Sequence, residues 1–193
     1  MTVHGHRKQT KEQKGAKYTT SSHERRRNIR VLGIDPGTAR IGYGTIIACG
    51  DALTHVGSGL VRFPRATGAE RLHRIAEAIG ALLRAERPDC VVIERLFMTR
   101  NQRTAMSVAE ARGVIMAAVA ARRIPLTELT PSAVKFAVAG DGRAPKAAVA
   151  RMVGRLLNKQ FRVVDDVTDA LAIAIAGASM VSFGVRHGRH TRS

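Results

Sequence analysis

The chain has 193 residues, of which 45% are apolar, enough for one sizeable core but too few residues for two ordinary domains. Its 32 lysines and arginines against 15 aspartates and glutamates give a formal net charge of +17, which favours a polyanionic partner such as nucleic acid. No apolar run approaches the roughly 20 residues of a membrane span, so we exclude a membrane-spanning protein and expect a cytoplasmic one.

Both ends of the chain are predicted to be basic, disordered segments. Residues 1–29 carry eight lysines or arginines against two glutamates and show no hydrophobic periodicity. Three interpretations of this arm remain open: it binds DNA, it has no function, or the natural start of the protein lies near Val31. Residues 182–193 form the predicted tail, so the folded domain is expected at 30–181.

The first part of that domain is predicted to hold three strands and a helix. Short apolar runs bounded by proline, glycine and aspartate are typical of strands and tight turns. Short connections favour antiparallel neighbours, so these strands should form a meander at one side of a sheet. Leucines and isoleucines then recur at helical spacing until Pro88. The predicted strands are 30–35, 41–49 and 54–63, and the predicted helix is 68–87.

The remainder alternates strands with helices. The last helix is almost wholly apolar after an acidic start, as expected of a buried helix. Antiparallel strands followed by alternating helices and strands are typical of an α/β fold, a mixed five-stranded sheet with helices on both faces. The predicted strands are 90–94 and 126–129, and the predicted helices are 104–122, 131–138, 145–157 and 165–180.

Two acidic residues stand at the ends of predicted strands. Asp35 follows the apolar run of the first strand and Glu94 that of the fourth, so both carboxylates would lie at the rim of the sheet. Each has a plainer explanation, because an aspartate before Pro-Gly is a common turn former and a strand-end glutamate can pair with Arg95. Neither acid predicts a site by itself.

Three further acids, Asp165, Asp166 and Asp169, open the last helix, where capping and the helix dipole account for one or two. Either of the first two shares a helix face with Asp169. Clustered carboxylates repel unless a cation neutralises them, and hard oxygen ligands suit Mg²⁺ or Mn²⁺. A pair of such ions about 3.5–4 Å apart activates water against a phosphodiester. Acids that can bind metal ions, in a chain whose positive charge favours nucleic acid, therefore predict a nuclease.

Four motifs, in this order and spacing, resemble the RuvC-type crossover-junction endodeoxyribonucleases. The resemblance extends from about Arg30 to Met180. It implies a ribonuclease-H-like fold and a homodimer that resolves Holliday junctions in homologous recombination and DNA repair by symmetric cuts in two opposed strands. The motifs are GIDPGT at 33–38 followed by Gly42-Tyr43-Gly44, VIERLFMTRN at 92–101, EARGV at 110–114 and DVTDALAIAIA at 166–176.

The resemblance implies that four acids are catalytic and bind the metals: Asp35, Glu94, Asp166 and Asp169. Asp165 departs from the family pattern by adding an acid beside Asp166, which leaves open which of the two binds metal. The spacing to Asp169 and the apolar run that follows favour Asp166. The expected cofactor is Mg²⁺, with Mn²⁺ as a substitute, at two ions per subunit.

The resemblance also implies contacts with DNA. Phe97 would insert at the four-way junction, whereas the residues alone allow an ordinary core aromatic. Lys135 and Lys146 would lie near the scissile phosphate, whereas composition alone favours two solvated lysines. The helix at 110–119 would form the dimer, although its alanine-rich face fits a core equally well. A branch-migration helicase complex is a further expected partner.

Three other functions fit part of the pattern. A ribonuclease or a general structure-specific nuclease could use the same fold and acids, because neither feature names a substrate. An actin-like ATPase would use the turn at 33–37 as a phosphate loop, but the chain is too short for two such lobes and the Asp166/Asp169 pair would be unexplained. A non-catalytic junction-binding protein would need only the basic surface.

Overall fold

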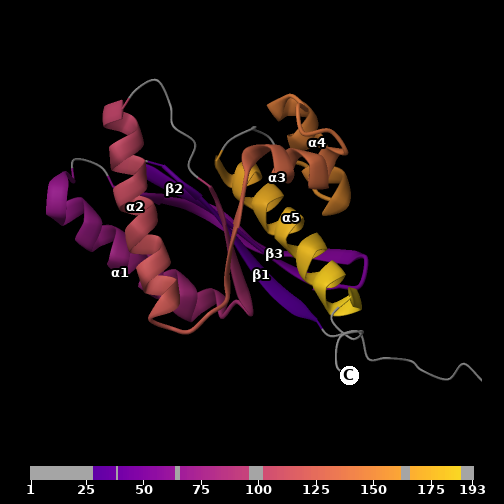
Figure 1. The fold of residues 1–193 in the computed structure, drawn as a ribbon, viewed down its shortest axis with the longest axis horizontal. Coiled ribbons are helices and arrows are strands. Elements are labelled where there is room, and N and C mark those ends of the chain that lie inside the picture. Colours follow the sequence, from indigo (N-terminus) through magenta and orange to yellow (C-terminus); the bar gives the residue numbers. More distant parts are fainter. Residues whose placement is uncertain (1–27, 38, 64–65, 96–101, 162–165, 188–193) are drawn as a thin grey trace, which may run out of the picture.

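A five-stranded mixed sheet forms the middle layer of the computed structural model, which describes residues 28–37, 39–63, 66–95, 102–161 and 166–187 (Figure 1). The strand order is β3-β2-β1-β4-β5. The first three strands form the predicted antiparallel meander, and β4 and β5 run parallel to β1. The strands are β1 (Ile29–Pro36), β2 (Arg40–Cys49), β3 (Ala52–Arg62), β4 (Cys90–Glu94) and β5 (Leu126–Leu129).

Helices cover both faces of the sheet, which confirms the predicted architecture (Figure 1). Two helices lie on one face, α1 (Gly68–Glu86) and α2 (Gln102–Ala120). Three lie on the other face, α3 (Pro131–Ala139), α4 (Lys146–Leu156) and α5 (Asp166–His187). None of the helices in the described ranges is long and apolar enough to cross a membrane.

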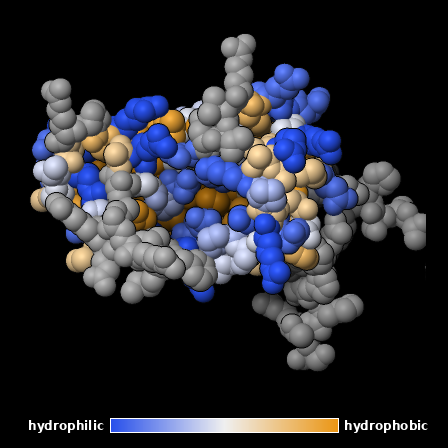
Figure 2. Space-filling view, turned by 90° about the horizontal axis from the view of Figure 1, so that it is seen from above, coloured by the Kyte–Doolittle hydropathy of each residue, from blue (hydrophilic) through white to orange (hydrophobic). Residues whose placement is uncertain are grey.

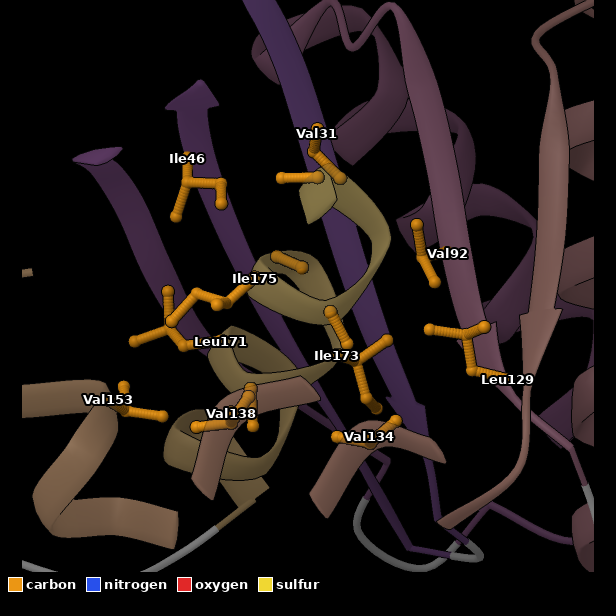
Figure 3. Packing of buried hydrophobic residues seen from close by; sticks show 14 of the residues in the cluster. Val31, Ile46, Val92, Leu129, Val134, Val138, Val153, Leu171, Ile173 and Ile175 are labelled. Carbon is orange, nitrogen blue, oxygen red and sulfur yellow. The ribbon is translucent and has the colours of Figure 1, made fainter. Parts of the chain in front are cut away.

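The hydrophobic core is divided in two by the sheet. Alternate residues of β1 point to opposite faces, so Val31 packs with α3, α4 and α5 while Leu32 and Ile34 pack with α1 and α2. In the first of these clusters, Ile173 of α5 lies near Val134 of α3 (Figure 3). Burial of each such side chain contributes about 1.5–3 kcal/mol, which explains why both faces of β1 are apolar.

Helix α5 lies unusually close to the sheet because glycines face it. A Cβ atom on Gly33 would clash with the carbonyl oxygen of Ala170, and a Cβ atom on Gly42 would clash with that of Asp166. Gly42 is the cross-strand partner of Asp35. Gly33 and Asp35 are two apart on β1, so both face the side of the sheet on which α5 lies. The first turn of α5 is therefore held beside the end of β1.

Most predicted boundaries agree with the structure to within two residues, but the predicted end of the last helix is wrong. That helix continues past Met180 to His187, so 182–187 do not belong to a disordered tail. The physical reason is that this stretch contains no proline, and extending an existing helix costs far less than starting one. The proposed arm up to residue 27 lies outside the described residues.

Candidate metal centre

Three of the predicted acids meet at the edge of the sheet where α5 begins. Asp35 lies at the end of β1, and Asp166 and Asp169 lie in the first turn of α5. One carboxylate oxygen from each comes within 4.8 Å of the other two. The first turn of α5 places both of its acids on the side that faces Asp35, because residues three apart share a helix face. These three side chains could hold a metal ion.

Glu94, the fourth predicted acid, lies at the same edge. It ends β4, which runs parallel to β1 with Ile93 paired to Ile34, so Asp35 and Glu94 follow neighbouring strand ends. Glu94 and Asp35 line one pocket of about 260 Å³ together with Asp169. Glu94 is outside the group of three whose oxygens lie within 4.8 Å, but it borders the same space.

Repulsion between these acids is visible in their protonation. The pKa of Asp35 is raised to about 7, first by burial and then by the negative charges of Asp169, Glu94 and Asp166, while Lys146 opposes the rise. Among the described residues, the donors at this edge are four carboxylates, a set that suits a hard cation such as Mg²⁺. A divalent cation would remove the repulsion, so the residues present fit a metal of this kind.

The pKa of Glu94 is raised for the same reasons, with burial first and the charge of Asp169 second. Lys135 and Lys146 lower it, which places both lysines within electrostatic reach of Glu94. Both lysines also line the pocket that contains the acids. Both lysines therefore lie beside the acids, and their contact with the scissile phosphate stays a prediction.

Helix α3 directs Lys135 toward the pocket. Its start is fixed by Thr130, whose hydroxyl accepts a hydrogen bond from the amide of Ala133 at 3.1 Å, and by Pro131 at the first helical position. Its end is fixed by Gly140, whose φ of 76° lies in the left-handed region that glycine adopts readily. Lys135 lies in the middle of this short, capped helix.

Lys146 is the first residue of α4 and forms an ion pair with Asp169. Burial lowers the pKa of Lys146, but the hydrogen bond to Asp169 and the negative charges of Asp169, Asp35 and Asp166 outweigh it, so the pKa is raised. Lys146 is therefore protonated at neutral pH and supplies a fixed positive charge beside the acids.

Arg40 is a part of this site that the sequence did not predict. It begins β2, and its guanidinium forms an ion pair with Asp166, with an additional hydrogen bond of 3.3 Å from Nη2 to Oδ1. The signal in the sequence is faint: a basic residue opens the strand that returns from the Asp35-Pro36-Gly37 turn. Viewed from the end where α5 begins, hydrophilic residues cover much of the surface between apolar patches (Figure 2).

The predicted site residue Phe97 and Asp165, the alternative to Asp166, are not described by the structure. Phe97 lies within 96–101 and Asp165 within 162–165, both outside the described residues, so their roles stay predictions. Helix α2 is described in large part: Ala111, Ile115 and Val119 are buried against the sheet and α1. One face of α2 is therefore core, and the dimer predicted for this helix stays a prediction.

The sheet order and the helices on both faces define a ribonuclease-H-like protein, and its acids gather at one edge, at the ends of β1 and β4 and the start of α5. The family model "Crossover junction endodeoxyribonuclease RuvC" matches residues 31–177. The chain belongs to this RuvC family of endonucleases, which are hydrolases. Membership of the family implies dependence on a divalent metal.

Curated relatives and solved structures agree with this assignment. The RuvC protein of Heliobacterium modesticaldum is 45% identical over 157 residues, which cover 80% of this chain and 97% of the relative. A structure titled "T. thermophilus RuvC in complex with Holliday junction substrate" superposes with a TM-score of 0.75 at 31% identity, covering 81% of this chain and 96% of that one. The yeast mitochondrial resolvase Ydc2, at 16% identity and a TM-score of 0.62, shares the fold.

Proposed function

We propose that this protein resolves Holliday junctions in homologous recombination and DNA repair by hydrolysing one phosphodiester in each of two opposed strands. The observation that carries the proposal is the meeting of Asp35, Asp166 and Asp169, with Glu94 beside them, at one edge of a basic protein. The T. thermophilus relative, whose title names a Holliday junction substrate, supports the choice of substrate.

In this proposal the four acids hold two Mg²⁺ ions, for which Mn²⁺ can substitute. When bound, such ions activate a water molecule and stabilise the leaving oxygen of a phosphodiester. Asp35 is close to all three other acids, because the charges of Asp169, Glu94 and Asp166 each raise the pKa of its carboxyl. A carboxyl group binds a metal ion in its ionised form, and a bound cation would favour that form by lowering the pKa of Asp35.

The lysines bind and orient the substrate. Lys146 stays protonated beside Asp169, and Lys135 lies across the same pocket, so both ammonium groups can attract the phosphate to be cut. A phosphate entering this pocket would otherwise meet four carboxylates and be repelled. The two lysines thus offset the acids on the side from which DNA approaches.

Three features of the proposal rest on the family resemblance, and a fourth, the cytoplasmic location, rests on the sequence. Phe97 inserts at the junction, where stacking on the bases would hold the strands apart. A homodimer supplies two sites related by two-fold symmetry, which matches the paired cuts. A branch-migration helicase complex delivers the junction, and the reaction takes place in the cytoplasm.

The decisive experiment is the cleavage of a synthetic four-way DNA junction, compared with linear duplex DNA and with an RNA/DNA hybrid. With Mg²⁺ we expect paired nicks in opposed strands of the junction, and with EDTA none. Equal cleavage of all three substrates would refute junction specificity and favour a general nuclease. Tight junction binding without cleavage would instead indicate a non-catalytic binding protein.

The basic arm at 1–29 is proposed to strengthen DNA binding without sequence preference. Its deletion is expected to make the logarithm of the junction association constant fall less steeply with the logarithm of salt concentration, because fewer phosphate counter-ions are released. The slopes are measured with a fluorescent junction between about 50 and 200 mM salt. Identical slopes for the full chain and the deletion would show that the arm contributes nothing to binding.

A further inference from the structure

The ion pair between Arg40 and Asp166 joins the start of β2 to the start of α5. The side chain of Arg40 is 53% exposed and that of Asp166 20% exposed. Both carboxylate oxygens are engaged, Oδ2 by Nε and Oδ1 by Nη2. Asp166 also belongs to the three acids whose oxygens lie within 4.8 Å of one another. The guanidinium thus occupies oxygens that a metal ion would need.

Arg40 and Lys146 divide the acids of α5 between them. Lys146 pairs with Asp169, and Arg40 pairs with Asp166. Both side chains are 53% exposed, but Lys146 lines the pocket and is attracted by Asp169, Asp35 and Asp166, whereas the ion pair that the structure gives for Arg40 is with Asp166. Arg40 is therefore the cation of the pair that can leave its acid at little cost, as exposed ion pairs are worth little.

We propose that Arg40 is an exchangeable counter-ion: it neutralises Asp166 in the metal-free protein, is displaced when a metal ion binds, and then contacts a DNA phosphate. This inference rests on the proposed function, because it takes Asp166 as a metal ligand. A guanidinium is suited to both positions, since it pairs in bidentate fashion with carboxylates and with phosphates alike. Metal and DNA would then favour each other's binding, and the coupling is reciprocal.

The competing explanation is a permanent structural ion pair that orients Asp166 for the metal. The two explanations predict opposite effects of removing the guanidinium. If Arg40 competes with the metal, its loss makes metal binding tighter. If Arg40 positions Asp166, its loss makes metal binding weaker.

Arg62 provides a matched control. It is the direct cross-strand partner of Arg40 on β3, is likewise exposed, and carries the same charge. The ion pair that the structure gives for Asp166 is with Arg40. Arg62→Gln therefore removes one positive charge from the same edge without removing a contact to the acid, and Arg40→Lys retains the charge but loses the bidentate geometry.

The first measurement is the affinity for Mn²⁺ without DNA, by electron paramagnetic resonance of the free ion, using the full chain and its variants. Arg40→Gln is expected to bind Mn²⁺ about three- to fivefold more tightly than the wild type, the upper part of the range for removing an exposed ion pair. Arg40→Lys should fall between them, and Arg62→Gln should stay within about twofold of the wild type. Circular dichroism checks that each variant is folded.

The second measurement is the factor by which Ca²⁺ raises the affinity for a four-way junction, with a denaturing gel to verify that the DNA stays uncut. Arg40→Gln should lose about three- to tenfold of this factor, because no guanidinium is released toward the phosphate. Arg62→Gln should keep the wild-type factor, whatever its own baseline affinity.

Weaker Mn²⁺ binding by Arg40→Gln, or equal shifts for both glutamine variants, would overturn the inference while leaving the metal centre intact. An unchanged Ca²⁺ factor in Arg40→Gln would overturn the transfer to phosphate. If the wild type and every variant fail to bind Mn²⁺, the proposed function fails as well, so the two failures are distinguishable.

Discussion

Asp35→Asn is expected to abolish junction cleavage and, at the same time, to stabilise the metal-free protein at neutral pH. Cleavage should fall by at least about a thousandfold, because the variant lacks the carboxylate at the end of β1 that meets the two acids of α5. Junction binding should persist, since the basic residues are unchanged. Cleavage falls while stability rises, because the clustered negative charges that attract a metal ion repel one another when no metal is bound.

The pH dependence follows from the raised pKa of Asp35, about 7 in the folded protein against an ordinary value of 3.8. Between these values the folded protein binds more protons than the unfolded chain. The free energy of unfolding is therefore undiminished by Asp35 below about pH 4, and it falls as the pH rises through 7 because the buried carboxyl must ionise. Asparagine cannot ionise, so this loss disappears in the variant. We expect a gain of roughly 1–3 kcal/mol at pH 8 and none at pH 4.

Urea unfolding with EDTA at both pH values measures the gain, and repeating it with Mg²⁺ tests the metal. Mg²⁺ should stabilise the wild type and have little effect on Asp35→Asn. Glu77→Gln is the control, because Glu77 is an exposed carboxylate on α1 whose loss should change stability by less than about 0.5 kcal/mol. Equal stability of Asp35→Asn and wild type at pH 8 would contradict the buried, repelled state assigned to Asp35.

Gly33→Ala is expected to destabilise the protein by about 3 kcal/mol or more and to abolish cleavage in whatever fraction remains folded. The added methyl group would clash with the carbonyl oxygen of Ala170 and lie 2.6 Å from the amide nitrogen of Ala174, both backbone atoms of α5. Backbone cannot rotate away as a flexible side chain can. The helix would have to move off the sheet, and Asp166 and Asp169 would move with it.

Gly113→Ala is the matched control for this substitution. Gly113 lies within α2, and a Cβ atom there would meet nothing within 4 Å. Alanine has a higher helix propensity than glycine, so this variant should be more stable by about 0.5–1 kcal/mol; it is a control for stability, because Gly113 lies on the helix predicted to form the dimer. Thermal melts and junction cleavage compare the two variants. A Gly33→Ala protein as stable and active as the wild type would show that α5 does not need its close approach to β1.

The meeting of the acids at one edge could be predicted from the sequence because each acid lies at an end of an element that local patterns define. Asp35 and Glu94 follow apolar runs, and Asp166 and Asp169 open a buried helix, so the fold alone brings them to one edge. The family resemblance then favoured Asp166 over its neighbour Asp165 as the metal ligand. It also pointed to Lys135 and Lys146, which composition would have left as ordinary surface residues.

The features that the sequence did not predict depend on contacts between distant segments. The Arg40–Asp166 ion pair joins residues 126 positions apart, and no local pattern announces such a contact. Gly33 looked like part of a turn motif, whereas its measurable role is to admit the backbone of α5. Such contacts follow from how elements pack in three dimensions, which hydrophobic periodicity does not specify.

The position of α5 also has a consequence for protein synthesis. This helix completes one of the two cores and supplies two of the clustered acids, yet of the described elements it is the last to leave the ribosome. A nascent chain that has released β1 and β4 carries Asp35 and Glu94 but lacks the rest of the acid cluster. The acid cluster can therefore assemble only after α5 has been released, at the stage when the core that this helix completes can also form.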